Sequence, residues 1–128
     1  MDVNGLAAAI EYELQTFSDA VCEKIGKAVD IVGNEVNAEI KSHVAFDQPT
    51  EKYVQAFRVK KMDTSKYCRS RIWHVAAPHY RLTHLLEHGH ALRNGSRTKA
   101  FPHIIFGEEL AERRMFELSE KAVQDAGV

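Results

Sequence analysis

The chain has 128 residues, of which 45% are hydrophobic and 27% charged, values typical of one globular domain and unlike those of a disordered chain. The formal charge of −1 excludes a uniformly basic or acidic protein. No apolar run reaches the roughly 18 residues that span a bilayer, and the N-terminus lacks a basic region followed by an apolar core. We therefore expect one domain without a membrane span or a secretion signal, folded in the cytoplasm.

The small net charge conceals three blocks of alternating sign. Residues 1–51 carry ten acidic and three basic residues, residues 52–99 carry two and eleven, and residues 100–128 carry six and three. The formal charges of the blocks are −7, +9 and −3. Such blocks can face each other within a fold, meet across a contact between subunits, or face a polyanion. All three alternatives are open at this point.

The first segment predicts one long amphipathic helix. Asn4 is a plausible N-cap, and Gly26 and Gly33 would permit the close approach of another backbone. A helix of about 38 residues would be ~57 Å long, well beyond the diameter of a domain of this size. It must therefore bend, break near a glycine, or extend past its own core to contact a neighbour. The apolar residues that define its face recur at steps of three and four: Leu6, Ile10, Leu14, Phe17, Val21, Ile25, Val29, Val32, Val36 and Ile40.

A turn, a short helix and a β-hairpin are expected next. A proline within the polar segment 47–50 bars continuation of the helix and predicts a turn, and residues 50–56 can form a short helical turn. Residues 57–62 alternate apolar with basic side chains, and residues 71–75 are rich in β-forming types. Because residues 63–66 have turn chemistry, the two strands should pair in antiparallel fashion.

The following segment predicts another short helix and a polar loop. Pro78 ends the second strand, and residues 80–88 can form two helical turns closed by Gly89, the residue type preferred where φ is positive. Residues 93–99 are polar and contain a glycine, so we expect this loop to be disordered in the free protein and to become ordered on assembly. Its basic residues are Arg93, Arg97 and Lys99.

A C-terminal helix completes the predicted elements. It should begin between His103 and Glu108. One apolar face is marked by Ala111, Met115, Leu118 and Ala122. Three acidic residues would lie near its positive end: Glu108, Glu109 and Glu112.

These elements predict an α+β fold in a single domain spanning residues 1–128. The long N-terminal helix should pack on a small antiparallel β-sheet, with the second helix at the C-terminus. The three parts are the long helix at 1–45, the hairpin and loop region at 46–103, and the C-terminal helix at 104–128.

The segment 80–91 holds the most informative motif, and it admits two interpretations. His84, Glu87 and His88 match the inverted zinc-protease pattern, in which two histidines one helical turn apart bind a metal and the carboxylate activates a water. A third ligand would have to come from Glu108, Glu109 or Glu112. Alternatively the segment is a structural corner in which the histidines hydrogen-bond backbone groups around Gly89. Its leucines would then pack inward: Leu82, Leu85 and Leu86.

The motif and its flanks resemble a known family. The matching pieces are Thr50-x-x-Tyr53-x-x-x-Phe57-Arg58-Val59-Lys60-Lys61, Tyr80-Arg81-Leu82-Thr83-His84-Leu85-Leu86-Glu87-His88-Gly89-His90-Ala91, Arg93-Asn94-Gly95 and Pro102-His103-Ile104 before an acidic helix. In this order they resemble the tail-completion, or neck, proteins of long-tailed bacteriophages and prophages, which join head and tail. The chain departs from the family at Glu51, where a glycine is common, and at Pro102, which alone represents a proline-rich approach to the last helix.

The resemblance implies a noncatalytic virion component of the head–tail junction, without cofactor or metal, that acts by oligomeric assembly. Its implied partners are copies of itself in a ring, other phage head-connector and tail proteins, and, without sequence specificity, the DNA that passes through. It would be made in the host bacterial cytoplasm and located in the virion. Two alternatives are a metal-dependent hydrolase that uses His84, Glu87 and His88, and a nonspecific DNA-binding module.

The segregated charges agree with assembly from identical subunits. A ring requires a heterologous interface, in which two different patches of one surface meet, and patches of opposite sign suit such a contact. Four basic residues of the hairpin should pair with acidic residues of a neighbour or face the lumen: Lys60, Lys61, Arg69 and Arg71. The other interface candidates are the loop residues Arg93, Arg97 and Lys99.

Overall fold

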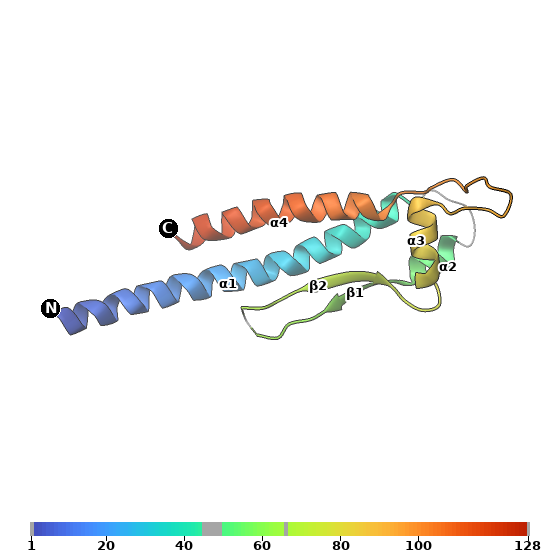
Figure 1. Ribbon diagram of the computed structural model, residues 1–128. Coiled ribbons are helices and arrows are strands. Elements are labelled where there is room, and N and C mark those ends of the chain that lie inside the picture. Colours follow the sequence, from blue (N-terminus) through green and yellow to red (C-terminus); the bar gives the residue numbers. More distant parts are fainter. Residues whose placement is uncertain (1, 45–49, 66, 128) are drawn as a thin grey trace.

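The computed structural model describes residues 2–44, 50–65 and 67–127 (Figure 1). Most of the turn predicted at 47–50 lies outside the described residues. The elements in chain order are α1 (Val3–Ser42), α2 (Thr50–Gln55), β1 (Phe57–Lys61), β2 (Arg71–Val75), α3 (Tyr80–His88) and α4 (Ile104–Ala126). They confirm the predicted α+β class, with a long helix on a small antiparallel sheet and a second long helix at the C-terminus.

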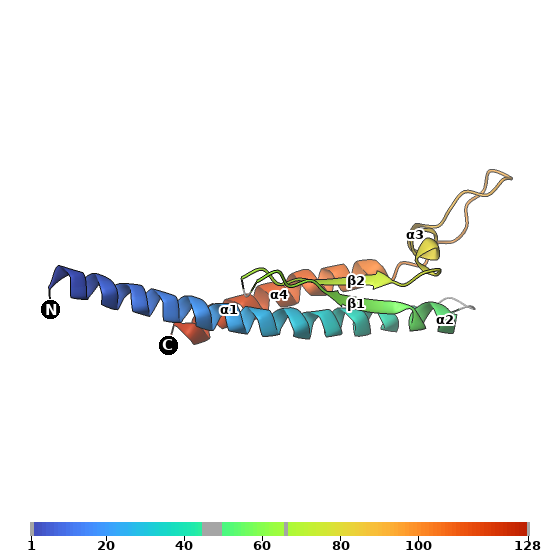
Figure 2. The same ribbon diagram turned by 90° about the horizontal axis from the view of Figure 1, so that it is seen from below.

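The first helix, α1, is uninterrupted over 40 residues, which corresponds to about 60 Å. Its N-cap is Asp2, whose carboxylate accepts the Gly5 N–H at 2.6 Å, so the prediction of Asn4 was wrong. The helix does not break near a glycine, and its N-terminal part extends past the core of the protein (Figures 1 and 2). Its N-terminal end projects beyond the C-terminal end of α4.

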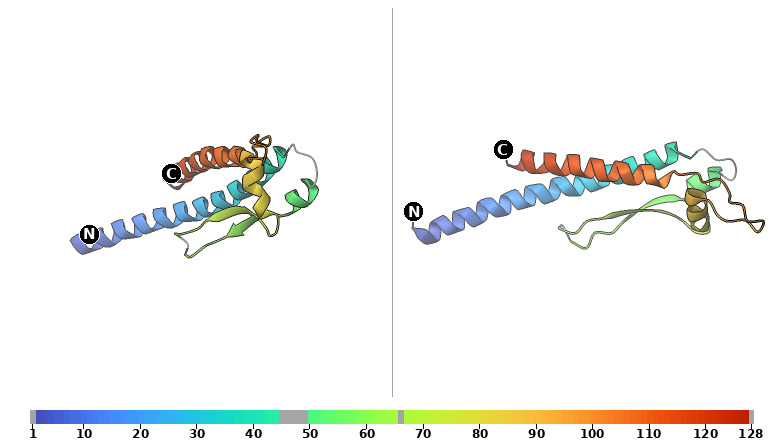
Figure 3. Two further views of the ribbon diagram at one scale, coloured as in Figure 1. Left: turned by 45° about the vertical axis from the view of Figure 1, so that its right-hand side comes forward. Right: turned by 45° about the horizontal axis from the view of Figure 1, so that its top comes forward.

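The hairpin and α4 lie on either side of α1 (Figures 1 and 3). Gly107 in the first turn of α4 faces Ile40, and at the other end a Cβ built on Gly127 would lie 3.8 Å from the ring of Phe17. Between these ends, Arg114 of α4 forms a bidentate ion pair with Glu35 of α1, with N···O distances of 2.9 and 3.1 Å. The two helices therefore contact each other along the whole of α4.

The hairpin has the predicted antiparallel register, with Phe57 opposite Val75. Phe57 and Val75 are buried toward α1, and the Trp73 indole N–H donates to the Asn37 side-chain oxygen at 3.1 Å. Alternation along the strands places four side chains on the outer face, where they are exposed. These are Arg58, Lys60, Ile72 and His74.

Two glycines of α1, Gly26 and Gly33, make room for the hairpin. A Cβ on Gly26 would collide with the guanidinium of Arg69, and one on Gly33 would lie 3.3 Å from the Val59 side chain. Both glycines thus admit side chains, so the prediction of a close backbone approach was wrong. The small size of glycine is what allows the hairpin to lie against the helix here.

The core is concentrated where the C-terminal part of α1 meets α2 and the base of the hairpin. Ring contacts within it are edge to face, with centroids 5.1 Å apart for Tyr53 and Phe57 and 4.8 Å for Phe57 and Trp73. Its buried members are Ile40, Tyr53, Ala56, Phe57 and Val75. None of the helices in the described ranges has the length and apolar content needed to cross a bilayer.

Candidate functional site

The segment 80–91 folds into a corner around Gly89. The helix α3 ends at His88, and Gly89 has φ = 71°, which confirms the predicted positive φ. A Cβ at this position would lie 2.6 Å from the Thr98 carbonyl oxygen, so both the backbone conformation and the space require glycine. The chain leaves the corner as a loop and returns at Phe101, whose N–H donates to the Leu86 carbonyl at 2.7 Å.

Glu87 connects this corner to the start of α4. Its carboxylate accepts the backbone N–H groups of His103, Ile104 and Ile105 at 2.9, 2.8 and 3.4 Å. These N–H groups belong to the first turn of a helix and have no partner within it. Burial raises the pKa of Glu87, but the three N–H donors and the nearby His103 outweigh it, so the pKa lies below its ordinary value. Glu87 is therefore an N-terminal cap supplied by a different helix.

The capping function of Glu87 corrects one prediction and bears on another. The first turn of α4, residues 104–107, contains no acidic residue, so Glu108, Glu109 and Glu112 are not the groups that meet its positive end. The hydrolase alternative requires the Glu87 carboxylate to face a metal-bound water, whereas both of its oxygens accept backbone N–H groups. Among the residues described, no group of three or more His, Cys, Asp or Glu side chains could hold a metal ion.

His103 is the functional residue of the corner that the sequence did not single out. It is fully buried, and its Nδ1 lies 2.8 Å from the Phe101 carbonyl oxygen, which can only accept, so Nδ1 carries a proton. Its Nε2 lies 2.8 Å from the hydroxyl of Tyr53, which joins α2 to the start of α4. Burial raises the pKa of Tyr53. The only signal in the sequence was that Tyr53 and His103 both lie in the pieces that resemble the phage family.

Most of the other motif residues on α3 are exposed, and Leu86 is the exception among the leucines. His84 and His88 are exposed on α3, with ring centroids 5.2 Å apart. Leu82 and Leu85 are 36% and 38% exposed, and Leu86 packs against the core. The prediction that all three leucines pack inward was wrong for two of them, because α3 rests on the body of the protein along one side only. The buried histidine of the corner is His103.

The loop that follows Gly89 projects from one end of the molecule (Figures 1 and 2). It is folded back on itself, since the Leu92 N–H donates to the Ser96 carbonyl at 2.7 Å and the Thr98 N–H donates to the His90 carbonyl at 2.8 Å. The disorder expected for residues 93–99 in the free protein stays a prediction. The three interface candidates on this loop are exposed: Arg93, Arg97 and Lys99.

Arg71, one of the four basic interface candidates of the hairpin, is engaged within its own chain. Its side chain is 9% exposed and contacts the carboxylates of Asp30 on α1 and Asp63 beside the strands. Lys61 also lies 3.6 Å from Asp63. Arg71 is therefore not free to pair with a neighbour, which corrects that prediction. Opposite charges of the hairpin and α1 therefore face each other within the fold.

The other hairpin candidates differ in position. Lys60 is exposed on the outer face of β1. Arg69 is half-buried, with its guanidinium over Gly26 on α1. Lys60 thus faces away from the rest of the chain, whereas Arg69 lies against α1.

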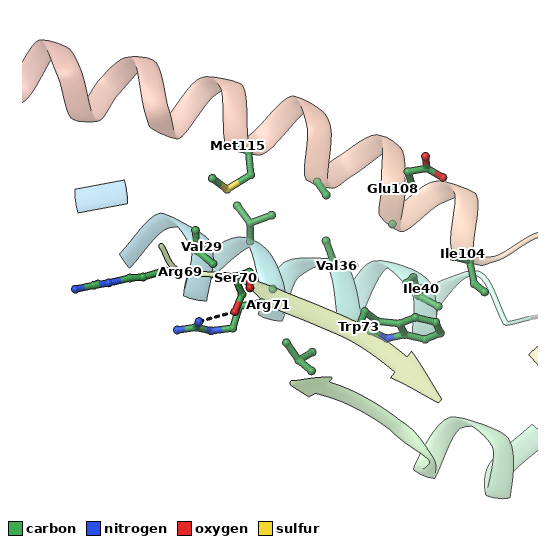
Figure 4. Close-up of a pocket in the computed structure, with 15 residues that line it drawn as sticks. Val29, Val36, Ile40, Arg69, Ser70, Arg71, Trp73, Ile104, Glu108 and Met115 are labelled. Atoms are coloured by element: carbon green, nitrogen blue, oxygen red, sulfur yellow. Dashed lines mark hydrogen bonds between the residues drawn. The ribbon is translucent and has the colours of Figure 1, made fainter. Parts of the chain in front are cut away.

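An apolar groove separates α4 from the hairpin, with α1 as its floor (Figure 4). Its volume is about 510 Å³. The floor extends from Val29 to Ile40, Trp73 and Arg69 belong to the hairpin wall, and Met115 belongs to the α4 wall. The sequence did not predict this groove, because the apolar faces of α1 and α4 are compatible with a filled interface.

The N-terminal part of α1, residues 3–17, forms an overhang with an exposed apolar stripe. The hairpin reaches only as far as Gln15, whose side chain donates to the Tyr67 hydroxyl at 3.3 Å, and α4 ends near Phe17. A contiguous apolar surface of this kind indicates an interaction site. Its members are Val3, Leu6, Ile10, Leu14 and Phe17, with exposed fractions of 82%, 53%, 51%, 63% and 40%.

Comparison of the chain with models of known protein families, with curated proteins and with solved structures gave no match. Its function is therefore inferred from its own surfaces. These are the capped corner, the projecting basic loop, the groove and the overhang.

Proposed function

We propose that this protein is a noncatalytic structural protein of the head–tail junction of a long-tailed bacteriophage, and that it acts by oligomeric assembly. The observation that carries the proposal is the overhang, whose apolar stripe faces water in the single subunit. Large exposed apolar surfaces on folded chains mark contacts with other macromolecules. The stripe belongs to a rigid helix, so it is presented in a fixed direction, as an assembly contact requires.

The energetics of the overhang favour an assembly over a simple pair of stripes. Leu6, Ile10 and Leu14 are already about half covered, so complete burial of each contributes about 1 kcal/mol. Association costs about 4–15 kcal/mol in lost rotational and translational freedom. The stripe therefore needs a partner surface that is itself apolar, or several contacts formed together. A ring supplies the second condition, because every subunit makes two contacts.

The corner supports the same proposal. Tyr53, Glu87 and His103 come from three separate pieces of the resemblance to tail-completion proteins, and they contact one another directly or through backbone groups. Their hydrogen bonds fix the positions of α2, α3 and α4. A motif whose polar groups bond to each other and to the backbone fits a shape-determining function better than catalysis.

The exposed basic residues suit contacts with other components of the virion. Arg93, Arg97 and Lys99 lie on the projecting loop, and Lys60 lies on the outer face of the hairpin. Such groups bind acidic protein surfaces or phosphates without sequence specificity. In the proposed setting they contact the head-connector and tail proteins or the passing DNA.

The test is deletion of the gene from a phage or prophage that encodes this chain. We expect filled heads and free tails that fail to join, restored by the wild-type gene supplied in trans, and we expect the protein to be present in purified wild-type virions but not in the separated heads or tails before joining. Infectious, joined particles made without the protein would refute the proposal. Genes for portal, capsid or tail-tube proteins beside it would support it.

A further inference from the structure

We propose that the overhang of one copy docks into the apolar groove of a second copy, between its α4 and its hairpin. The inference rests on the proposed function, since it names the contact through which the subunits assemble. The overhang is a ridge of apolar side chains that are 40–82% exposed, and the groove is an apolar depression without an occupant among the described residues.

The two surfaces have matching lengths. The floor of the groove extends from Val29 to Ile40, eleven residues apart on one helix, which corresponds to about 17 Å. Within the stripe, Leu6 and Phe17 are also eleven residues apart, about 17 Å. The groove can thus receive the stripe from Leu6 to Phe17, with the ridge of one helix lying between two walls.

One small residue lines the groove where side chains of the overhang would enter. Ala111 on the α4 wall carries only a methyl group, whereas the spaces beside Gly33 and Gly107 are filled by Val59 and Ile40. Side chains such as Ile10 and Leu14 therefore meet the groove at Ala111 and at its apolar floor.

The overhang cannot occupy the groove of its own chain. Groove floor and overhang are parts of α1, which is one continuous helix of 40 residues. They therefore point along the same axis and cannot fold onto each other. The occupant must come from a second molecule.

Charge favours a second copy as that molecule. Residues 3–17 of the overhang contain two acidic residues and no basic residue, whereas residues 57–75 of the hairpin contain six basic residues and one acidic residue. Glu11 and Glu13 flank the stripe of the overhang and are exposed, and Arg69 lines the hairpin wall of the groove. Placing the acidic flank against the hairpin wall sets the orientation of the docked helix.

The contact is heterologous, because the stripe and the groove are different patches. Each copy then offers one free overhang and one free groove, and addition of copies continues until a ring closes or a filament forms. This property distinguishes the contact from a symmetric pairing of two overhangs, which stops at a dimer.

The first experiment measures the oligomeric state of the full chain by sedimentation velocity and native mass spectrometry over a range of concentrations. We expect wild-type oligomers, and we expect Ile10→Glu with Leu14→Glu to shift the midpoint of assembly at least about tenfold toward higher concentration, since docking would bury two charges. Both side chains are at least half exposed in the subunit, so circular dichroism should show an unchanged fold. Tyr12→Glu is the matched control, because Tyr12 is 71% exposed on the opposite side of the same helix.

The second experiment tests whether stripe and groove meet. Ala111→Trp fills the groove and should be monomeric at concentrations where the Ile10→Glu, Leu14→Glu variant is monomeric, with circular dichroism again reporting the fold. A mixture of this variant with the Ile10→Glu, Leu14→Glu variant should give one-to-one heterodimers and nothing larger, since one partner retains the overhang and the other retains the groove.

Three outcomes would overturn the inference. They are a wild-type chain that is monomeric at all concentrations, a double-glutamate variant that assembles as the wild type does, and two folded monomeric variants that fail to pair. None of them decides the proposed function, which the gene deletion tests separately through the joining of heads to tails.

Discussion

The Glu87 carboxylate at the end of α3 accepts the N–H of Ile104 at 2.8 Å and so caps a helix that begins seventeen residues later in the chain. A cap normally comes from the residue just before the helix, which here is His103, and the His103 side chain is instead directed to Tyr53 and Phe101. The position of α4 is thereby tied to that of α3. A change at Glu87 should therefore alter the packing of both α3 and α4.

Replacement of Glu87 by alanine should lower the free energy of unfolding by about 2–3 kcal/mol, because one buried and two partly buried N–H groups lose a charged acceptor. Glu87→Gln retains one acceptor oxygen and should cost about half as much. Urea unfolding of the variants measures both values. Glu109→Ala is the control, and as a change of an exposed residue on α4 it should remain within about 0.5 kcal/mol of wild type. A Glu87→Ala variant as stable as this control would show that the cap contributes little.

The same carboxylate predicts a dependence of stability on acid. Because the pKa of Glu87 in the folded protein is lowered from its ordinary value of 4.5, its contribution is complete above that value and is lost as the pH falls through the folded pKa. The charged or titratable groups beside it are His103, at 3.2 Å, and Tyr53. The pKa values of Glu35 and Asp63 are also lowered, so these carboxyl groups likewise make the protein less stable as the pH falls. We therefore expect the stability difference between wild type and Glu87→Gln to shrink below about pH 4.5, and a constant difference between pH 7 and pH 3 would contradict this.

Local patterns predicted the elements of this fold well. The three- and four-residue spacing of apolar residues defines α1 and α4, alternation defines β1, β-forming residue types define β2, and Gly89 ends α3 with a positive φ. These features depend on contacts within a few residues, which the sequence displays directly. The N-cap of α1 was misplaced because Asp2 and Asn4 are equally good capping types, and only the start of the helix decides between them.

The hydroxyl of Tyr53, 2.8 Å from the Nε2 atom of His103, should contribute to stability in the same corner. Tyr53→Phe removes a hydrogen bond at a fully buried site and should lower the free energy of unfolding by about 1–2 kcal/mol. Tyr67→Phe is the matched control at a tyrosine that is 58% exposed, and its effect should be within about 0.5 kcal/mol. Thermal and urea unfolding measure the two changes. Equal effects of both changes would show that the Tyr53 hydroxyl does not stabilise the corner.

The candidate site was less predictable than the elements, since its contacts join residues far apart in the chain. Glu87 was singled out for its spacing to two histidines, but its partners are the backbone groups of α4, which have no sequence signature. Leu82 and Leu85 were expected in the core because leucine usually is buried, whereas burial of a helix face depends on what lies beside it. The groove results from the angle between α4 and the hairpin, which periodicity does not encode.

Arg71 and Lys60, both predicted as interface residues, should now behave differently. Arg71→Ala should lower the urea midpoint of unfolding, because it removes the partner of Asp30 and Asp63 and so separates the hairpin from α1. Lys60→Ala should leave the midpoint unchanged, since Lys60 is exposed on the outer strand face, while weakening assembly in sedimentation experiments. Equal unfolding midpoints for the two variants would show that the internal contacts of Arg71 do not stabilise the subunit.

The loop beyond Gly89 should gain protection from hydrogen exchange on assembly. The amides of Leu92 and Thr98 donate to carbonyls of the same loop, which projects into solvent, so these bonds open without disturbing the core (Figure 2). We expect fast exchange at both amides in the subunit with the Ile10→Glu and Leu14→Glu changes, and slower exchange in wild-type oligomers or after addition of head-connector protein. The Phe101 amide, which donates to the Leu86 carbonyl at the corner, should be protected in every state and serves as the internal reference. Strong protection of Leu92 and Thr98 in the monomer would contradict the predicted ordering on assembly.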